Sequence, residues 1–193
     1  MIEILILSIV QGITEFIPVS SSAHLILFSK YFNFNNQGLT LDISLHIGSL
    51  IAVLIYFRDD LINFIKNKSL FLKIIVSAIP IMIVGYLLVK LNLIDRLRNF
   101  QVIGWMTIIF GVFLYIADKR QIEKKINQHF NYKTAILIGL IQVLALIPGV
   151  SRSGITISAA RIFEFKREDS LKISFLLSMP TLFSVSFFNI FNL

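Results

Sequence analysis

Cysteine is absent from this chain of 193 residues, and its absence excludes a disulfide framework. Charged side chains are also scarce, at 15% of the sequence. A cleavable secretory signal is not indicated either. Glu3 stands where a basic segment would be expected, and no small-residue cleavage site precedes the first polar break. We therefore expect the first apolar helix to remain part of the protein.

Apolar residues dominate what is present. They make up 56% of the chain, and phenylalanine alone occurs 18 times, which is well above the apolar share of soluble domains. A membrane span needs roughly 20 apolar residues. Uninterrupted runs of that order lie at about 41–57, 71–89, 100–117 and 171–191, and interrupted runs lie at about 4–28 and 134–160. The sequence predicts an all-α integral membrane protein with a single transmembrane domain over 1–193.

Lysine and arginine residues in the short loops indicate how the chain crosses the bilayer. If each interrupted run dips into the membrane as a helix, a turn and a second helix, thirteen of these cations fall on one side and four on the other. If the second interrupted run crosses once, the counts become nine and eight. Because cytoplasmic loops carry the excess of Lys and Arg, we predict two re-entrant hairpins that enter from opposite faces, the first from the extracytoplasmic side.

The net charge of +7 has the same origin. These basic residues lie in loops beside the apolar runs, where attraction to anionic lipid headgroups explains them. We therefore expect the bilayer, and no nucleic acid, as the partner of the basic surface.

Both interrupted runs share one pattern. QGITEFIPVSSSAH (11–24) and QVLALIPGVSRSGIT (142–156) each lead from a Gln through apolar residues to a Pro and then a polar, Ser-rich turn. Aligned on Gln11 and Gln142, and with one gap, they also superpose Pro18 on Pro148 and Ser21 on Ser151. With the opposite orientations indicated by the loop charges, this similarity predicts inverted-topology repeats. Broken helices at membrane depth are tolerated where they are buried or line a wet cavity, so we expect the two tips to meet at one polar site.

The second tip has the features of a phosphate cradle. Pro148 ends a helix, and Ser151 or Ser153 can cap the next one, which leaves its N–H groups and positive dipole end directed into the gap. Arg152 adds a permanent charge with a planar fork suited to phosphate oxygens. These features predict an oxyanion site.

The first tip supplies reactive groups. Gln11 and Glu15 are four residues apart and share a helix face, where they could hold a metal ion or a water. His24 lies three residues beyond Ser21 and could act as its base, or could attack phosphorus itself. The candidate nucleophiles at this tip are Ser20, Ser21 and Ser22.

Structural explanations compete with these assignments. Serines in membrane helices often bond a backbone carbonyl. On one face of the next run lie Asp42 and His46, which either face the same cavity or seal a helix contact.

An ionised side chain at mid-bilayer costs roughly 2.5–3.5 kcal/mol. Glu15 and Arg152 therefore indicate function, and a buried structural ion pair between them is the alternative.

The motifs themselves point to a known family. QGITEFIPVSSSAH and PGVSRSGITIS resemble the two signature motifs of the undecaprenyl-diphosphate phosphatase family, bacterial membrane enzymes also known for bacitracin resistance. LDISLHIGSLIAVLIYFRDD is similar to its third conserved region, and the resemblance runs from about residue 4 to residue 185. It implies a multi-pass helical bundle of two inverted repeats in the bacterial cytoplasmic (inner) membrane. The implied reaction is hydrolysis of undecaprenyl diphosphate to the monophosphate, which recycles the lipid carrier for cell-wall synthesis.

The resemblance also implies residue roles. The acidic motif falls on Gln11 and Glu15, where many members have Glu at both positions, and implies a divalent cation, Mg²⁺ or Ca²⁺. The nucleophile region falls on Ser21, with His24 as partner or rival. The residues on which the phosphate-binding motif falls are Ser151, Arg152, Ser153 and Thr156.

One departure from the family concerns the end of the chain. Members usually continue for two further spanning helices, whereas one apolar segment follows the second motif here. We therefore expect a C-terminally short member with an incomplete second repeat. An inactive truncated homologue and a homo-oligomer both stay open. A lipid-phosphate flippase or anion transporter would use the same arginine and helix ends without a nucleophile, and the pair of Ser21 and His24 favours hydrolysis.

Overall fold

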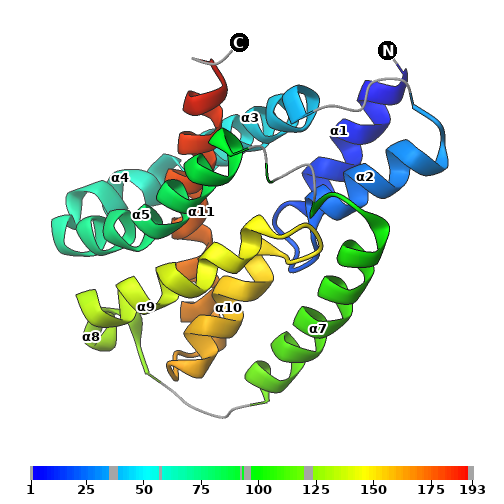
Figure 1. Cartoon of the computed structure of the whole chain (residues 1–193). Coiled ribbons are helices and arrows are strands. Elements are labelled where there is room, and N and C mark those ends of the chain that lie inside the picture. Colours follow the sequence, from blue (N-terminus) through cyan, green and yellow to red (C-terminus); the bar gives the residue numbers. More distant parts are fainter. Residues whose placement is uncertain are drawn as a thin grey trace.

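The computed structural model describes residues 2–34, 39–56, 58–91, 93, 97–119 and 124–190. Within these ranges the regular structure is helical, apart from one isolated bridge between Lys124 and Phe165 (Figure 1). The elements are α1 (Ile2–Thr14), α2 (Ser21–Tyr31), α3 (Leu39–Tyr56), α4 (Arg58–Lys66), α5 (Lys68–Lys90), α7 (Phe100–Asp118), α8 (Ile126–His129), α9 (Tyr132–Gln142), the 3₁₀ turn η1 (Val143–Leu146), α10 (Arg152–Ile162) and α11 (Arg167–Ile190). The all-α prediction is confirmed.

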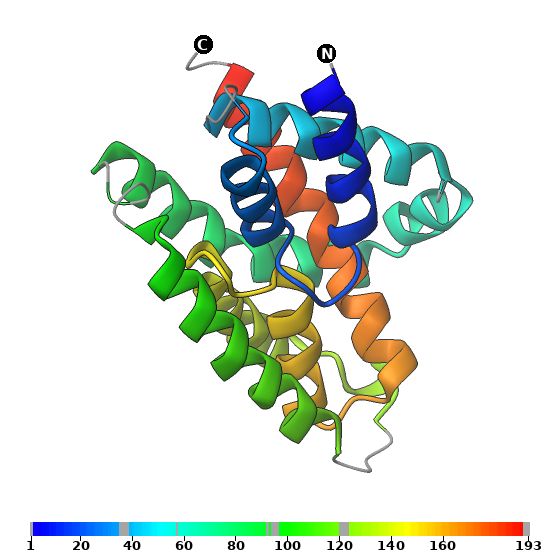
Figure 2. The same cartoon turned by 90° about the vertical axis from the view of Figure 1, so that its right-hand side faces the viewer.

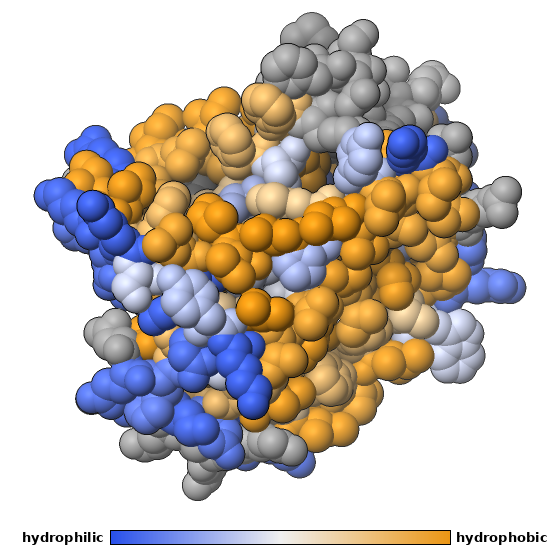
Figure 3. Space-filling view, turned by 60° about the vertical axis from the view of Figure 1, so that its left-hand side comes forward, coloured by the Kyte–Doolittle hydropathy of each residue, from blue (hydrophilic) through white to orange (hydrophobic). Residues whose placement is uncertain are grey.

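Among the described residues, two helices are long and apolar enough to cross a membrane, α5 and α7. Only 22% of the most apolar window of α5 and 11% of that of α7 is buried inside the protein. Their apolar side chains therefore face outward, which suits lipid better than water. Figure 3 shows the result as a broad hydrophobic surface with hydrophilic residues gathered at its edges.

The two interrupted runs each form two helices joined by an irregular tip. α1 and α2 lie side by side, and residues 15–20 connect them; α9, η1 and α10 form the second pair, connected by residues 147–151. Figures 1 and 2 show the pairs approaching from opposite ends of the molecule, so that their tips meet near its middle. Which segments span or re-enter a bilayer stays a prediction.

Close backbone packing holds the second pair in place. α9 lies along α5 so closely that a Cβ added at Gly139 would come 2.0 Å from the carbonyl oxygen of Ser77. Gly149 in the second tip has a φ of +97°, and a Cβ there would come 2.6 Å from the carbonyl oxygen of Ile103 on α7. Glycine is required at both positions, because one has no room for a side chain and the other also needs a left-handed backbone.

The main core lies between α4, α5, α9, α10 and α11. The residues after the run 41–57 are predicted as a loop, but in the structure nine of them form the helix α4. The helix packs Phe64 against Phe71 of α5, with ring centroids 5.4 Å apart. The segment is short and charged and has no apolar run that would predict a helix. Its helix is stabilised by this contact with α5.

The ends of α7, α10 and α11 are tied together by arginines. Arg161, with 5% of its surface exposed, donates to the carbonyl oxygens of Phe165 (2.8 Å) and Asp118 (3.1 Å). Arg167 donates to both carboxylate oxygens of Asp118 at 2.8 and 2.7 Å, and these hydrogen bonds raise the pKa of Arg167 above its ordinary value. The contacts fix the far end of α10, the helix that begins at Arg152.

Candidate active site

The two tips touch each other directly. Ser153 Oγ, at the start of α10, donates a 3.0 Å hydrogen bond to the carbonyl oxygen of Ile17 in the first tip. A Cβ added at Gly154 would lie 3.5 Å from the carbonyl oxygen of Pro18, so the backbones are in close approach. The predicted meeting of segments 11–24 and 142–156 is therefore observed.

Serine caps orient both helix starts at this junction. Ser20 Oγ accepts from the backbone N–H of Ala23 at 3.3 Å, and Ser151 Oγ accepts from that of Gly154 at 3.1 Å. Both cap residues have extended backbones. The cap predicted at Ser151 is confirmed, Ser20 caps the other helix in the same way, and the positive dipole ends of α2 and α10 begin beside the junction.

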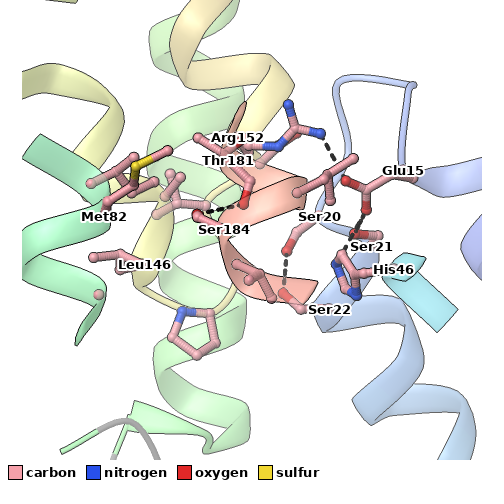
Figure 4. A pocket seen from close by; sticks show the side chains of 18 of the residues that line it. Glu15, Ser20, Ser21, Ser22, His46, Met82, Leu146, Arg152, Thr181 and Ser184 are labelled. Atoms are coloured by element: carbon pink, nitrogen blue, oxygen red, sulfur yellow. Dashed lines mark hydrogen bonds and ion pairs between the residues drawn. The ribbon is translucent and has the colours of Figure 1, made fainter. Parts of the chain in front are cut away.

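Glu15 is the centre of the polar network. Its side chain is only 4% exposed and both of its carboxylate oxygens are occupied. Oε2 accepts from Ser21 Oγ at 2.7 Å, and Oε1 accepts from Arg152 Nη2 at 2.7 Å (Figure 4). Oε2 also accepts from Gln11 Nε2 at 2.9 Å. An ionised carboxylate only accepts hydrogen bonds, so three donors directed at its oxygens favour the ionised form over the protonated one.

Arg152 and Glu15 form the direct ion pair that was the structural alternative. The pair does not use up the guanidinium, because a single nitrogen of its five-donor fork reaches Glu15 and its side chain keeps 16% of its surface exposed. Arg152 also lines a cavity, described next. A role in the fold and a role in binding are compatible here.

A cavity of about 980 Å³ opens beside the junction. Its polar end is formed by Glu15, Ser20, Ser21, Ser22, His46, Ser151 and Arg152. Its apolar wall includes Ile81, Met82, Val89, Leu146, Leu182 and Phe183. Lys90 and Arg98, at the end of α5 and before α7, also line it. The volume lies at the upper end of the range for small-molecule sites, roughly 300–1,000 Å³.

Four of the predicted site residues do not line this cavity: Gln11, His24, Ser153 and Thr156. Thr156 is fully buried, and its Oγ1 lies 2.8 Å from the carbonyl oxygen of Arg152, 3.0 Å from that of Ser153 and 2.7 Å from Ser174 Oγ, so its single hydroxyl proton is shared among these acceptors. His24 Nδ1 lies 2.7 Å from the carbonyl oxygen of Ser20, one turn earlier in the chain. Since a carbonyl only accepts, Nδ1 must donate, and the ring is directed at its own backbone.

Other residues join the site that were not among the predicted site residues. His46 Nε2, on α3, lies 3.4 Å from Glu15 Oε2 and the ring lines the cavity. The pairing of His46 with Asp42 cannot be compared, because the Asp42 side chain lies outside the described residues. Lys90 and Arg98 are the other additions. In the sequence, Lys90 and Arg98 are marked only as two of the four cations predicted on the side of the membrane that has few Lys and Arg residues.

The donor atoms for a divalent cation are few but suitable. In the described part of the chain, no three His, Cys, Asp or Glu side chains cluster. Gln11, however, is 1% exposed and its Oε1 has no hydrogen-bond partner, next to the carboxylate that its Nε2 contacts. Carboxylate and amide oxygens are the ligands that Mg²⁺ and Ca²⁺ prefer. The residues present therefore fit such an ion, with further oxygens coming from a phosphate ligand or water.

The chain matches a known protein family over nearly its whole length. The family profile described as bacitracin resistance protein BacA matches residues 4–193. The match includes both tips and all the residues that meet at Glu15.

Individual relatives are similar over nearly the whole chain. An undecaprenyl-diphosphatase of Pelagibacter ubique is 52% identical over 192 residues, which cover 99% of this chain and 75% of that protein. Proteins of the same name from Saccharophagus degradans and a Ruegeria species are 44% and 41% identical, covering 70% and 73% of their own lengths. This chain therefore spans about three quarters of the length of these relatives.

Proposed function

Because the chain belongs to the family of the bacitracin resistance protein BacA, we propose that it hydrolyses undecaprenyl diphosphate to undecaprenyl phosphate and inorganic phosphate. The observation that carries the proposal is the convergence of Ser21, Glu15 and Arg152 at one end of a large, mostly apolar cavity. An alcohol, a base and an anion clamp are the groups that phosphoryl transfer requires. Loss of the diphosphate's terminal phosphate regenerates the lipid carrier for cell-wall synthesis.

Ser21 is the proposed nucleophile. Its hydroxyl already donates to Glu15 Oε2 at 2.7 Å, so the proton can pass to the carboxylate as Oγ bonds to the terminal phosphorus. The bridging P–O bond then breaks and the prenyl monophosphate leaves. Water next attacks the phosphoserine, inorganic phosphate is released, and the proton returns from Glu15 to Ser21. His24 as the direct nucleophile is less favoured, because its ring is turned to the Ser20 carbonyl and lies off the cavity wall.

Charge on the transferring phosphoryl group needs compensation. Arg152 lines the cavity while one of its nitrogens bonds Glu15, which leaves the rest of its fork for phosphate oxygens. The N-terminal ends of α2 and α10, capped by Ser20 and Ser151, add positive dipole ends on either side. In phosphoryl transfer such positioning and electrostatic stabilisation account for most of the catalysis.

A divalent cation, Mg²⁺ or Ca²⁺, is part of the proposal. Glu15 and the unpartnered Oε1 of Gln11 would hold it. When bound, it would neutralise charge on the diphosphate oxygens. Arg152 beside the same carboxylate competes with the ion, so we expect cation binding to depend strongly on the diphosphate.

The prenyl tail would occupy the apolar wall of the cavity. Side chains of α5 and α11 form this wall, and large apolar residues nearby, such as Ile83 and Phe183, are 55% and 62% exposed. Such a surface lets a lipid chain pass between the cavity and the bilayer. The accompanying architecture is two inverted repeats with re-entrant tips, in the bacterial cytoplasmic membrane; the opposite approach of the two helix pairs supports it (Figure 2).

The test is release of inorganic phosphate from undecaprenyl diphosphate by the purified chain in detergent, with and without Mg²⁺. We expect turnover that stops when Glu15 is replaced by Gln, with the prenyl monophosphate as the only lipid product. Lipid transport across vesicle bilayers without any phosphate release would instead favour a flippase and would contradict the proposal.

A further inference from the structure

His46 is the histidine that faces the reacting groups, although the sequence pattern pointed to His24. Its ring lines the cavity, and its Nε2 lies 3.4 Å from Glu15 Oε2, the same oxygen that accepts the Ser21 hydroxyl (Figure 4). An ionised carboxylate only accepts, so this contact is attractive when Nε2 carries a proton. With its proton on Nε2, His46 acts on Glu15 as a donor.

The fold seats His46 there through α3. Ser49, one turn further along the same face of α3, lies with its Oγ 3.5 Å from Gln11 Nε2. Gln11 in turn bonds Glu15 Oε2. The face of α3 that carries His46 and Ser49 thus runs along the face of α1 and the first tip that carries Gln11 and Glu15.

Glu15 needs the contact with His46 because Arg152, which holds its other carboxylate oxygen, is also proposed to bind the phosphate. The carboxylate of a glutamate turns easily about its last torsion, since that torsion has no deep staggered wells. In the structure, Arg152 fixes Oε1 at 2.7 Å. When the other nitrogens of Arg152 bind phosphate oxygens, the guanidinium charge is shared between two anions, so its hydrogen bond to Oε1 weakens although Nη2 stays in place, and the orientation of Glu15 then depends more on the donors at Oε2.

We propose that His46 is a positioning residue: by donating to Oε2 of Glu15 it keeps that oxygen aimed at the Ser21 hydroxyl while Arg152 binds the phosphate. The inference rests on the proposed hydrolysis and deepens it. This role requires a hydrogen-bond donor at position 46. The carboxamide of glutamine, which has a similar reach, meets that requirement, and the apolar side chain of leucine, which has a similar size, does not.

The experiment compares His46→Gln, which keeps a donor, with His46→Leu, which fills the space without one. His46→Ala serves as a second non-donor variant if Leu does not fit. His129→Ala, in the exposed helix α8, is the matched histidine control. Each variant is assayed for kcat and KM with a prenyl diphosphate in detergent, and its thermal stability is measured to confirm that it is folded.

We expect His46→Leu to lower kcat by about 10- to 100-fold, the usual effect of a misplaced catalytic group, with KM within about twofold. His46→Gln should recover most of that loss, and His129→Ala should match the wild type. A stable His46→Leu with unchanged kcat would overturn the inference, as would a stable His46→Gln as impaired as His46→Leu, or a rise in KM alone. Absence of phosphate release from the wild-type chain would instead overturn the proposed function, and this inference with it.

Discussion

Arg152 Nη2 lies 2.7 Å from Glu15 Oε1, although the two residues are 137 positions apart in the chain. This contact joins the two tips and compensates a carboxylate that is 4% exposed. It also brings a guanidinium to the cavity wall. The guanidinium that forms the ion pair is therefore also the proposed anion clamp, and removing it tests both roles.

Arg152→Ala is expected to lower kcat by about 10²–10³-fold, because it removes a donor aimed at developing negative charge. It should also destabilise the fold by about 3–5 kcal/mol, since it leaves Glu15 buried without its partner. The measurements are phosphate release and thermal unfolding in detergent.

The control for Arg152→Ala is the double variant Glu15→Gln with Arg152→Ala. Removing both charges should restore much of the lost stability and none of the turnover. If the double variant regained activity, or if Arg152→Ala turned over at the wild-type rate, Arg152 would have no part in charge stabilisation.

Ser21→Ala should reduce phosphate release by about 10³-fold or more, because it removes the group that bonds to phosphorus. His24→Ala should keep measurable turnover. Ser8→Ala is the control, since Ser8 Oγ donates only to the carbonyl oxygen of Ile4 on the exposed face of α1.

Acid quenching after mixing with substrate labelled in its terminal phosphate should trap label on the wild-type protein and none on Ser21→Ala. Label retained by Ser21→Ala and lost in His24→Ala would reverse the two roles.

Gly139→Ala should destabilise the protein by about 1–3 kcal/mol, the usual cost of overpacking. The added methyl would meet the Ser77 backbone of α5 at 2.0 Å, and a backbone atom cannot move aside as a side chain can. Gly111→Ala in α7 is the matched control, because nothing lies within 4 Å of a Cβ there. Equal melting temperatures for the two variants would contradict the close contact of α9 with α5.

Lys90→Glu with Arg98→Glu should lower kcat/KM for the diphosphate by about tenfold at low salt and leave kcat nearly unchanged. Both residues line the cavity and neither contacts Glu15 in the hydrogen bonds or ion pairs described above, so they are expected to attract the anionic headgroup before chemistry begins. The loss should shrink as salt is added, because screening weakens the steering of the wild type more than that of the variant. Lys172→Glu in α11, away from the cavity, serves as the charge control; an equal effect there would indicate a general charge effect.

The sequence was informative where chemistry is concentrated in a short segment. Glu15 and Arg152 could be singled out because an ion at apolar depth is costly wherever the chain places it. Ser20 and Ser151 could be expected as caps because a proline before a serine-rich turn leaves few alternatives. The joining of the two tips followed from the rule that broken backbone at membrane depth must be covered.

Other parts of the site depend on packing between distant helices. His24 has favourable spacing from Ser21, but a histidine near a helix start can bond its own backbone, and the Ser20 carbonyl takes its ring. Thr156 is buried for the same kind of reason, with its hydroxyl satisfied by Arg152 and Ser174. From the sequence, His46 either faces the cavity or seals a helix contact, and only the packing of α3 beside α1 decides that it reaches Glu15.

The distance along the chain between the two tips has a consequence for biosynthesis. Glu15 is made early, and its guanidinium partner emerges more than a hundred residues later. A nascent chain therefore has no Arg152 beside this carboxylate until the second tip has been made. We expect phosphate release only from chains in which both tips have been synthesised and have docked.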